Sequence, residues 1–106
     1  MATFLNTTLS AISDVETIGY TSTSDSTIVL SILIANRNGN VAADITASQF
    51  DASSSLESHL AFTVPVPADA NLEILSNKYI LPSGKSIRFL SSASGYLDAT
   101  ISIVEV

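Results

Sequence analysis

The sequence predicts an all-β protein, an antiparallel β-sandwich of jelly-roll or Greek-key type with about eight short strands and little or no helix. Apolar residues alternate with period two rather than 3.6, and the alternating segments are rich in β-branched residues. Turn signals separate these segments at intervals of about 8 to 12 residues. With 106 residues, 46% hydrophobic and only 13% charged, the chain is too apolar for a disordered acidic tail. We therefore expect a single domain spanning residues 1–106.

The first 26 residues are the least regular part of the pattern. Their apolar residues suffice for two short strands, and the polar run 21–26 is typical of a turn or loop. We expect residues 1–26 to form either edge strands or a partly extended N-terminal arm. The apolar residues concerned are Phe4, Leu9, Ile12, Val15, Ile18 and Tyr20.

Residues 27–36 form the most apolar segment, and both of its faces are apolar. The alternation places Ile28, Leu30, Ile32 and Ile34 on one face, and Val29, Leu33 and Ala35 on the other. Such a strand is expected at the centre of a sheet, covered on both sides. The pair Asn38-Gly39 that follows is typical of a two-residue hairpin turn. It predicts that residues 41–50 return as a strand with one apolar face and one wet face.

The second half of the chain predicts five further strands. Residues 58–64 form the first, with Phe62 facing the core, and Pro65 and Pro67 are expected to end its pairing. Short strands at 71–75 and 78–81 lead to a β-turn at 81–84. Strands at 86–91, with Phe89 in the core, and at 97–106 complete the fold. In the last strand one face carries Leu97, Ala99, Ile101, Ile103 and Glu105.

The charge of the chain bears on its partners. A formal net charge of −6 argues against binding to nucleic acid or to an anionic membrane surface. All of the excess negative charge lies in residues 1–70. This distribution fits a solvated acidic surface that keeps the protein soluble, or a surface that meets a basic patch on another protein. The longest apolar-leaning run, residues 28–35, is far shorter than the roughly 20 residues of a membrane-spanning helix.

The side chains that usually carry chemistry are scarce. Without cysteine there is neither a disulfide nor a thiolate metal site, and one histidine cannot build a histidine zinc site. We expect His59 to point outward from a strand. Asp51, Ser53 and Ser55 match a metal-binding D-x-S-x-S string, but we interpret them as a loop whose side chains bond their own backbone. There is no nucleophile elbow and no glycine-rich phosphate loop. We expect no enzyme activity, no cofactor and no bound metal.

The edges of the predicted sheets favour association with other chains. An unpaired edge strand recruits another chain unless it is blunted, and few lysines are available here to blunt one. Subunit assembly is therefore the expected use of this surface. We expect the interface to include Phe4, Leu5 and Leu9 of the N-terminal segment, together with the acidic residues Asp14 and Glu16.

Several segments resemble small virion proteins of tailed bacteriophages, especially those of cyanobacteria. The likeness rests on patterns of apolar and turn residues in segments 1–9, 28–36, 64–75, 79–85 and 97–106. The resemblance implies a compact β-sandwich that acts in the virus particle. It implies a virion structural protein of the capsid cement or decoration type, which binds the major capsid protein or other virion subunits.

This resemblance also implies a location and an assembly. The protein would lie at the capsid surface of the virion, and in the host cytoplasm during assembly. A homo-oligomer is expected, with a trimer favoured because capsids offer local three-fold positions. A neck or tail accessory subunit is the alternative within this class. From a different class, a carbohydrate-binding β-sandwich module remains open, because exposed aromatic rings could stack on sugars.

Overall fold

The computed structural model describes residues 2–106, and they form nine β-strands. Across these residues no helix is long and apolar enough to cross a membrane. The predicted all-β class, an antiparallel β-sandwich, is confirmed. The strands are β1 (Thr3–Leu9), β2 (Thr17–Thr21), β3 (Ser26–Asn36), β4 (Ala43–Asp51), β5 (Leu56–Val66), β6 (Asn71–Glu73), β7 (Tyr79–Pro82), β8 (Lys85–Ser91) and β9 (Leu97–Glu105).

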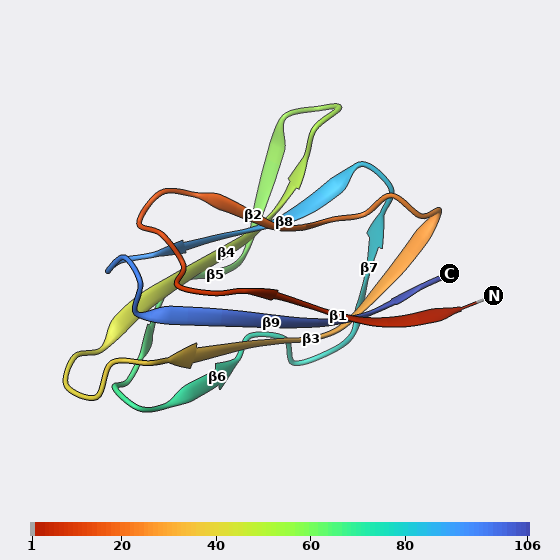
Figure 1. Ribbon diagram of the computed structural model, residues 1–106. Helices are drawn as coiled ribbons and strands as arrows, with labels where there is room; N and C mark the ends of the chain where they lie inside the picture. The colour runs from red at the N-terminus through yellow and green to blue at the C-terminus, as the bar shows by residue number, and fades with distance from the viewer. Residues whose placement is uncertain (1) are drawn as a thin grey trace.

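The strands form two sheets that lie face to face (Figure 1). The five-stranded sheet has the order β1-β9-β3-β6, with β7 pairing farther along β3, and the four-stranded sheet has the order β2-β8-β4-β5. The pairs are nested: β1 with β9, β2 with β8, β3 with β6 and β7, and β4 with β5. This nesting is the topology of a jelly roll, in which β6 and β7 together take the place of one strand.

The core lies between the two sheets and is built from their inward-facing residues. Ile34 and Ile101 of the five-stranded sheet and Ile45 and Phe89 of the four-stranded sheet have no exposed surface. Burying an aliphatic or aromatic side chain of this size stabilises the fold by about 1.5–3 kcal/mol. The predicted alternation of β8 and β9 is confirmed, since Phe89 and the face of β9 that starts at Leu97 point inward.

The prediction for β3 is right about its position and wrong about its faces. The strand lies centrally, between β9 and the pair β6 and β7. Its register against β9 shifts between Val29 and Ser31, which marks Leu30 as a bulge. The extra residue reverses the alternation, so Val29 faces inward together with Ile32 and Ile34. The outer face of β3 is not covered, and Leu33 is 38% exposed there.

The hairpin predicted at Asn38-Gly39 is wrong. β3 belongs to the five-stranded sheet and β4 to the four-stranded sheet, so the connection crosses from one sheet to the other. Both long edges of β3 are already paired, which leaves β4 no edge of β3 to join. The side chain of Asn38 instead accepts hydrogen bonds from the N–H groups of Asn40 and Val41, which bends the crossing loop.

The inward position predicted for Phe62 is also wrong, because this side chain is 65% exposed. Pairing between β4 and β5 shifts twice, on either side of Ala47, and both shifts add a residue to β5. Thr63, beside Phe62, has a left-handed φ of 49°. Pro65 lies within β5 and does not end it, because β5 is an edge strand whose outer side needs no N–H donor.

Candidate functional site

The outer face of the five-stranded sheet carries a continuous row of apolar side chains. The pairing registers place Phe4 opposite Val104, Val104 opposite Ile28, and Ile28 opposite Ile80. Side chains directly opposite one another lie on the same face of a sheet. We call these four residues, one each from β1, β9, β3 and β7, the apolar row. Phe4 is 76% exposed and Ile80 is 64% exposed, whereas Val104 in the middle is covered by its neighbours.

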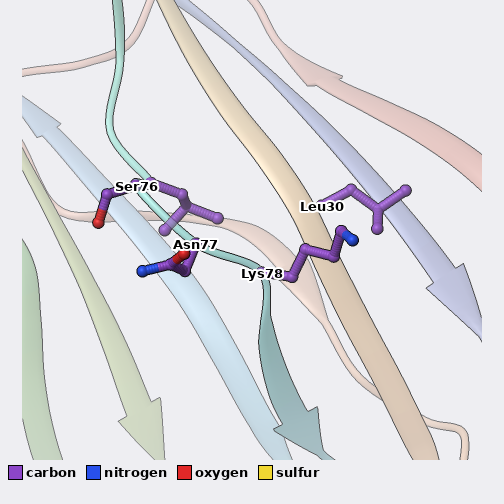
Figure 2. A pocket seen from close by; sticks show the side chains of 5 residues that line it. Leu30, Ser76, Asn77 and Lys78 are labelled. Atoms are coloured by element: carbon purple, nitrogen blue, oxygen red, sulfur yellow. The ribbon is translucent and has the colours of Figure 1, made fainter.

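A shallow pocket of about 480 Å³ lies next to the apolar row, where β6 gives way to β7 (Figure 2). The bulged residue Leu30 lines it, together with Leu75, Ser76, Asn77 and Lys78. In Figure 2 the side chain of Lys78 extends from the linking segment across β3 and points toward Leu30. The bulge at Leu30 therefore extends the exposed apolar surface beyond the row itself.

The rest of this outer face is mostly polar and carries few charged groups, among them the exposed Lys78 beside the pocket. The next row consists of Asn6, Ser102 and Ser31, and the row after it consists of Thr8, Thr100 and the exposed Leu33. Glu73 lies at its margin, and its carboxylate accepts hydrogen bonds from the backbone N–H groups of Ile32 at 2.8 Å and Leu75 at 3.2 Å. Between the segments of β3 that pair with β6 and with β7, no strand of the described chain faces Ile32 on this side. The Glu73 carboxylate accepts the hydrogen bond that such a strand would accept from the N–H of Ile32. A nearly uncharged and partly apolar face is easy to desolvate against another protein.

The outer face of the four-stranded sheet is different, because acidic side chains gather there around one arginine. The guanidinium of Arg88 forms an ion pair with Glu16 at 3.0 Å and lies 3.7 Å from the centre of the Phe50 ring. Ser48 donates a hydrogen bond to Glu57 at 2.6 Å, and this bond lowers the pKa of the Glu57 carboxyl below its ordinary value. These contacts engage Glu16, Glu57 and one terminal nitrogen of Arg88, whereas the buried Nε of Arg88 has no hydrogen-bond partner among the described residues.

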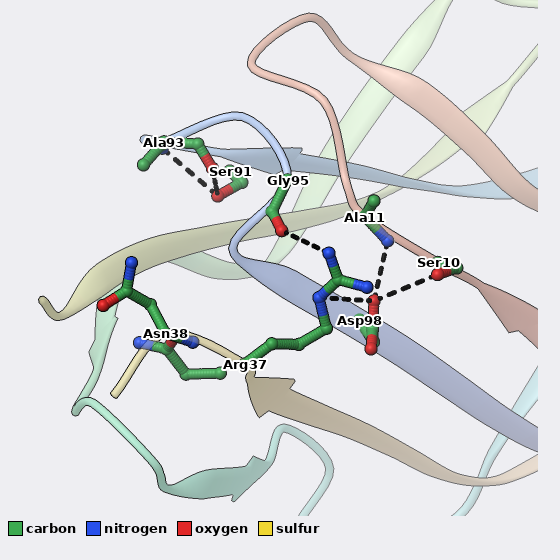
Figure 3. A network of polar contacts seen from close by, with 9 residues as sticks. Ser10, Ala11, Arg37, Asn38, Ser91, Ala93, Gly95 and Asp98 are labelled. Carbon is green, nitrogen blue, oxygen red and sulfur yellow. Dashed lines mark hydrogen bonds and ion pairs between the residues drawn. The ribbon is translucent and has the colours of Figure 1, made fainter. Parts of the chain in front are cut away.

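A second polar network holds one end of the sandwich together (Figure 3). The carboxylate of Asp98 accepts a hydrogen bond from the N–H of Ala11 at 2.7 Å and lies 3.9 Å from the guanidinium of Arg37. Arg37 also donates to the carbonyl oxygen of Gly95 at 3.1 Å. Ala11 has a left-handed φ of 54°, so the Asp98 contact stabilises an otherwise unfavourable backbone conformation. The network therefore joins the β1–β2, β3–β4 and β8–β9 connections and has a structural role.

The sequence-predicted interface residues are divided between different surfaces. Phe4 lies in the apolar row, while Leu5 and Leu9 of β1 face the space between the sheets. Leu5 is nonetheless 41% exposed, because the sandwich is open at this edge. Asp14 is exposed in the β1–β2 connection, and Glu16 is bound to Arg88 on the four-stranded sheet. Phe4 is thus separated from the acidic pair Asp14 and Glu16.

The other side chains considered for chemistry do not form a reactive site. His59 is exposed on β5, as predicted, and its ring lies edge-on to Phe62 with 4.9 Å between ring centres. Asp51 accepts hydrogen bonds from the N–H and the hydroxyl of Ser53, and these bonds lower the pKa of its carboxyl. The loop thus bonds its own backbone, as interpreted. Within residues 2–106 no group of three His, Asp or Glu side chains could hold a metal ion.

Sequence reasoning missed three members of the apolar row, Val104, Ile28 and Ile80. The relevant signal in the sequence is the segment 27–36 with two apolar faces, which predicts a strand covered on both sides and so does not point to an exposed apolar surface. The row itself depends on the registers between β1, β9, β3 and β7, and these registers join residues up to about 100 positions apart.

Comparisons with known proteins identify the fold. No family model matches the chain, and no curated protein matches its sequence. Among solved structures, the chain is similar to VP2 in the crystal structure of the subviral particle of infectious bursal disease virus. The two share 7% sequence identity with a TM-score of 0.53, over 96% of this chain and 33% of that one. The chain therefore spans about a third of the length of that VP2 chain. At this identity the likeness shows the fold alone.

Proposed function

We propose that the protein is a non-enzymatic structural protein of a bacteriophage virion that binds the major capsid protein and stabilises the capsid as a cement or decoration protein. The apolar row on the nearly uncharged face of the five-stranded sheet is the observation that carries this proposal. An exposed, contiguous apolar surface rimmed by polar residues is typical of a protein–protein interface. The row is the surface that we assign to the contact with the capsid.

The fold and the resemblance of the sequence support the same class. Jelly rolls are common in viral capsid domains, although lectins and cupins share the architecture. The segments that resemble small phage virion proteins include the strands that supply the row, β1, β3, β7 and β9. A carbohydrate-binding module has less support, because the two most exposed aromatic rings, Phe4 and Phe62, lie on different sheets and form no common stacking platform.

The two faces of the sandwich suggest how it is oriented on the particle. The apolar row would lie against the capsid, and the acidic outer face of the four-stranded sheet would point to solvent. Each contact is small, so one copy would bind only moderately tightly. Many copies on a repeating lattice would still stabilise the particle, because each bound copy adds its own contribution and holds neighbouring subunits together.

Adding the purified chain back to particles that lack it tests the proposal. The variant Ile80→Ser is expected to bind such particles about tenfold more weakly, because it loses the burial of one aliphatic side chain. Phe4→Ser should have a similar effect. Leu56→Ser is the matched control, since Leu56 is 69% exposed, close to the 64% of Ile80, but lies on the other sheet. Equal binding by Ile80→Ser and the wild-type chain would contradict the assigned surface.

The number of copies in each particle tests the placement. A cement protein should be present in hundreds of copies on the capsid, whereas a neck or tail subunit forms a closed ring of about 3 to 12 copies. Quantitative mass spectrometry of intact particles and separated tails measures this number. Recovery of the chain only with tails would reject the capsid role. So would undiminished heat and salt resistance of particles that lack it.

A further inference from the structure

Four sheet edges are open in this sandwich, and they are not equivalent. β5 contains Pro65 and two register shifts, and the register of β2 shifts between Ile18 and Tyr20. β6 and β7 are only three and four residues long. Short strands, prolines and bulges are the features that keep an edge from pairing with another chain. Three of the four edges are therefore protected.

The fourth edge, β1, has none of these protections. Its seven residues pair with β9 in unbroken register, and they include no proline, no glycine and no charged residue. In an antiparallel pair, alternate residues direct both their N–H and C=O groups away from the partner strand. On the open side of β1, no hydrogen bond joins these groups to any other residue of the described chain. The open edge of β1 is ready to accept a further strand.

We propose that this edge binds β1 of a second copy of the chain, antiparallel about a two-fold axis at Asn6. Only a register centred on Asn6 pairs all seven residues of β1 with those of the second copy. Thr3 then lies opposite Leu9, Phe4 opposite Thr8, Leu5 opposite Thr7, and Asn6 opposite Asn6. The same surface is used by both copies, as a two-fold interface requires.

The side chains of β1 are complementary to themselves in this register. Phe4 meets a β-branched threonine on the outer face, a favourable cross-strand pair. On the inner face Leu5 meets Thr7, so its 41% exposure at the open edge of the sandwich is reduced. No charged residue meets another, because β1 carries none. The net charge of −6 on each copy therefore creates no like-charge contact at the interface.

This pairing deepens the proposed function, on which its biological consequence depends. The two five-stranded sheets would join into one continuous sheet, with both apolar rows on the same outer face. The two Phe4 side chains would lie four residues apart along the strands, or about 13 Å at the usual rise per residue. A dimer would thus bind the capsid through two rows at once, with a gain in avidity. Its symmetry is two-fold, in place of the three-fold assembly that capsid symmetry suggests.

Charge substitutions at Asn6 test the pairing on the full chain in solution, without any capsid. Asn6 is exposed, and only the residue on the two-fold axis meets its own copy. Asn6→Lys alone and Asn6→Glu alone should each reduce the mass measured by sedimentation from that of a dimer to that of a monomer. An equimolar mixture of the two variants should restore the dimer, because Lys then meets Glu. Asn71→Lys is the matched control on exposed β6, at the opposite edge of the same sheet, and should leave the dimer intact.

The mass should be measured at a chain concentration of about 0.5 mM, because a single pair of strands is a small interface, and interfaces that bury less than about 1,200 Å² are typically weak. Far-ultraviolet circular dichroism checks that each variant is folded. A wild-type chain that stays monomeric at this concentration would overturn the proposal. A trimer, or a mixture of the two variants that remains monomeric, would overturn it as well. If a monomeric chain binds the capsid, the dimer proposal is wrong but the proposed function still holds.

Discussion

Tyr79 shows how one buried hydroxyl couples the fold to pH. Its ring packs against the core from the start of β7, and its hydroxyl has no hydrogen-bond partner among the described residues. Burial raises the pKa of Tyr79 from its ordinary value of 10.0 to about 12. The unfolded chain therefore loses this proton near pH 10, whereas the folded chain keeps it until about pH 12. Its contribution to stability is fully present below pH 10 and is lost as the pH rises through about 12.

We expect the free energy of unfolding to fall by about 1–2 kcal/mol between pH 10 and pH 12, allowing for the partial exposure of the ring. Burial, followed by the hydrogen bond to Glu105, raises the pKa of Tyr20 as well, so Tyr20 acts in the same direction. Tyr79→Phe should be at least as stable as the wild type at pH 7, because it removes an unpartnered hydroxyl. The variant should also show a smaller fall in the free energy of unfolding between pH 10 and pH 12. Urea unfolding over a pH series measures both effects. A clear loss of stability of Tyr79→Phe at pH 7 would contradict the conclusion that the Tyr79 hydroxyl has no hydrogen-bond partner.

Gly19 is required by packing rather than by backbone conformation. A Cβ at this position would lie 2.5 Å from Cε2 of Phe89, a side chain that is fully buried. Gly19→Ala must therefore displace the Phe89 ring, and should lower the free energy of unfolding by about 1–3 kcal/mol. Gly39→Ala is the control, because its nearest contact is Asp69 Oδ2 at an ordinary 3.5 Å. Thermal unfolding of the two variants measures the difference. Equal melting temperatures would show that the Phe89 ring can move aside without any loss of stability.

At the scale of an element, the connection from β3 to β4 depends on one asparagine. Asn36 is 6% exposed; its side-chain amide donates to the carbonyl oxygens of Val41 at 3.1 Å and Val66 at 3.0 Å. Its side-chain oxygen accepts from the N–H of Asn38 at 2.9 Å. Asn36→Ala leaves these groups without partners and should cost about 2–4 kcal/mol of stability. Urea unfolding measures the cost, and exposed Asn40→Ala is the control. Similar stability of the two variants would mean that backbone hydrogen bonds alone stabilise the β3–β4 connection.

The elements also show what could be predicted from the sequence. β8 and β9 alternate regularly from end to end, so their inward faces were predicted correctly. The alternation fails in β3, which has one inserted residue, and in β5, which has two, because each insertion reverses the face on which the following residues lie. Both faces of β3 are apolar, so the sequence pattern does not mark the insertion at Leu30. The sequence singled out Phe4 as an apolar residue of the N-terminal segment, and the structure places it on the exposed outer face. Its neighbours in the row could not be predicted, because a register between distant strands depends on tertiary packing.

At the scale of the whole molecule, three of the seven acidic side chains of residues 1–70 lie on one outer face, that of the four-stranded sheet. The outer face of the four-stranded sheet carries Asp44, Glu16 and Glu57, with Arg88 as partner to Glu16. The outer face of the five-stranded sheet carries the apolar row, and its carboxylates Glu73 and Asp98 are bound within the chain. Two interpretations of the acidic charge remain open: it keeps the outward face soluble, or it binds a basic partner. They differ in their dependence on salt.

If the apolar row makes the contact with the capsid, binding should change by less than about threefold between 50 mM and 500 mM NaCl. Burial of apolar surface is not screened by salt, whereas the Debye length falls from about 10 Å at 0.1 M to about 3 Å at 1 M salt. An acidic face bound to a basic patch would lose affinity by about tenfold or more over this range. The double variant Asp14→Asn/Asp44→Asn separates the two readings further. It removes acidic charge without touching the row, so it should bind particles as the wild type does, and weaker binding would assign the contact to the acidic face.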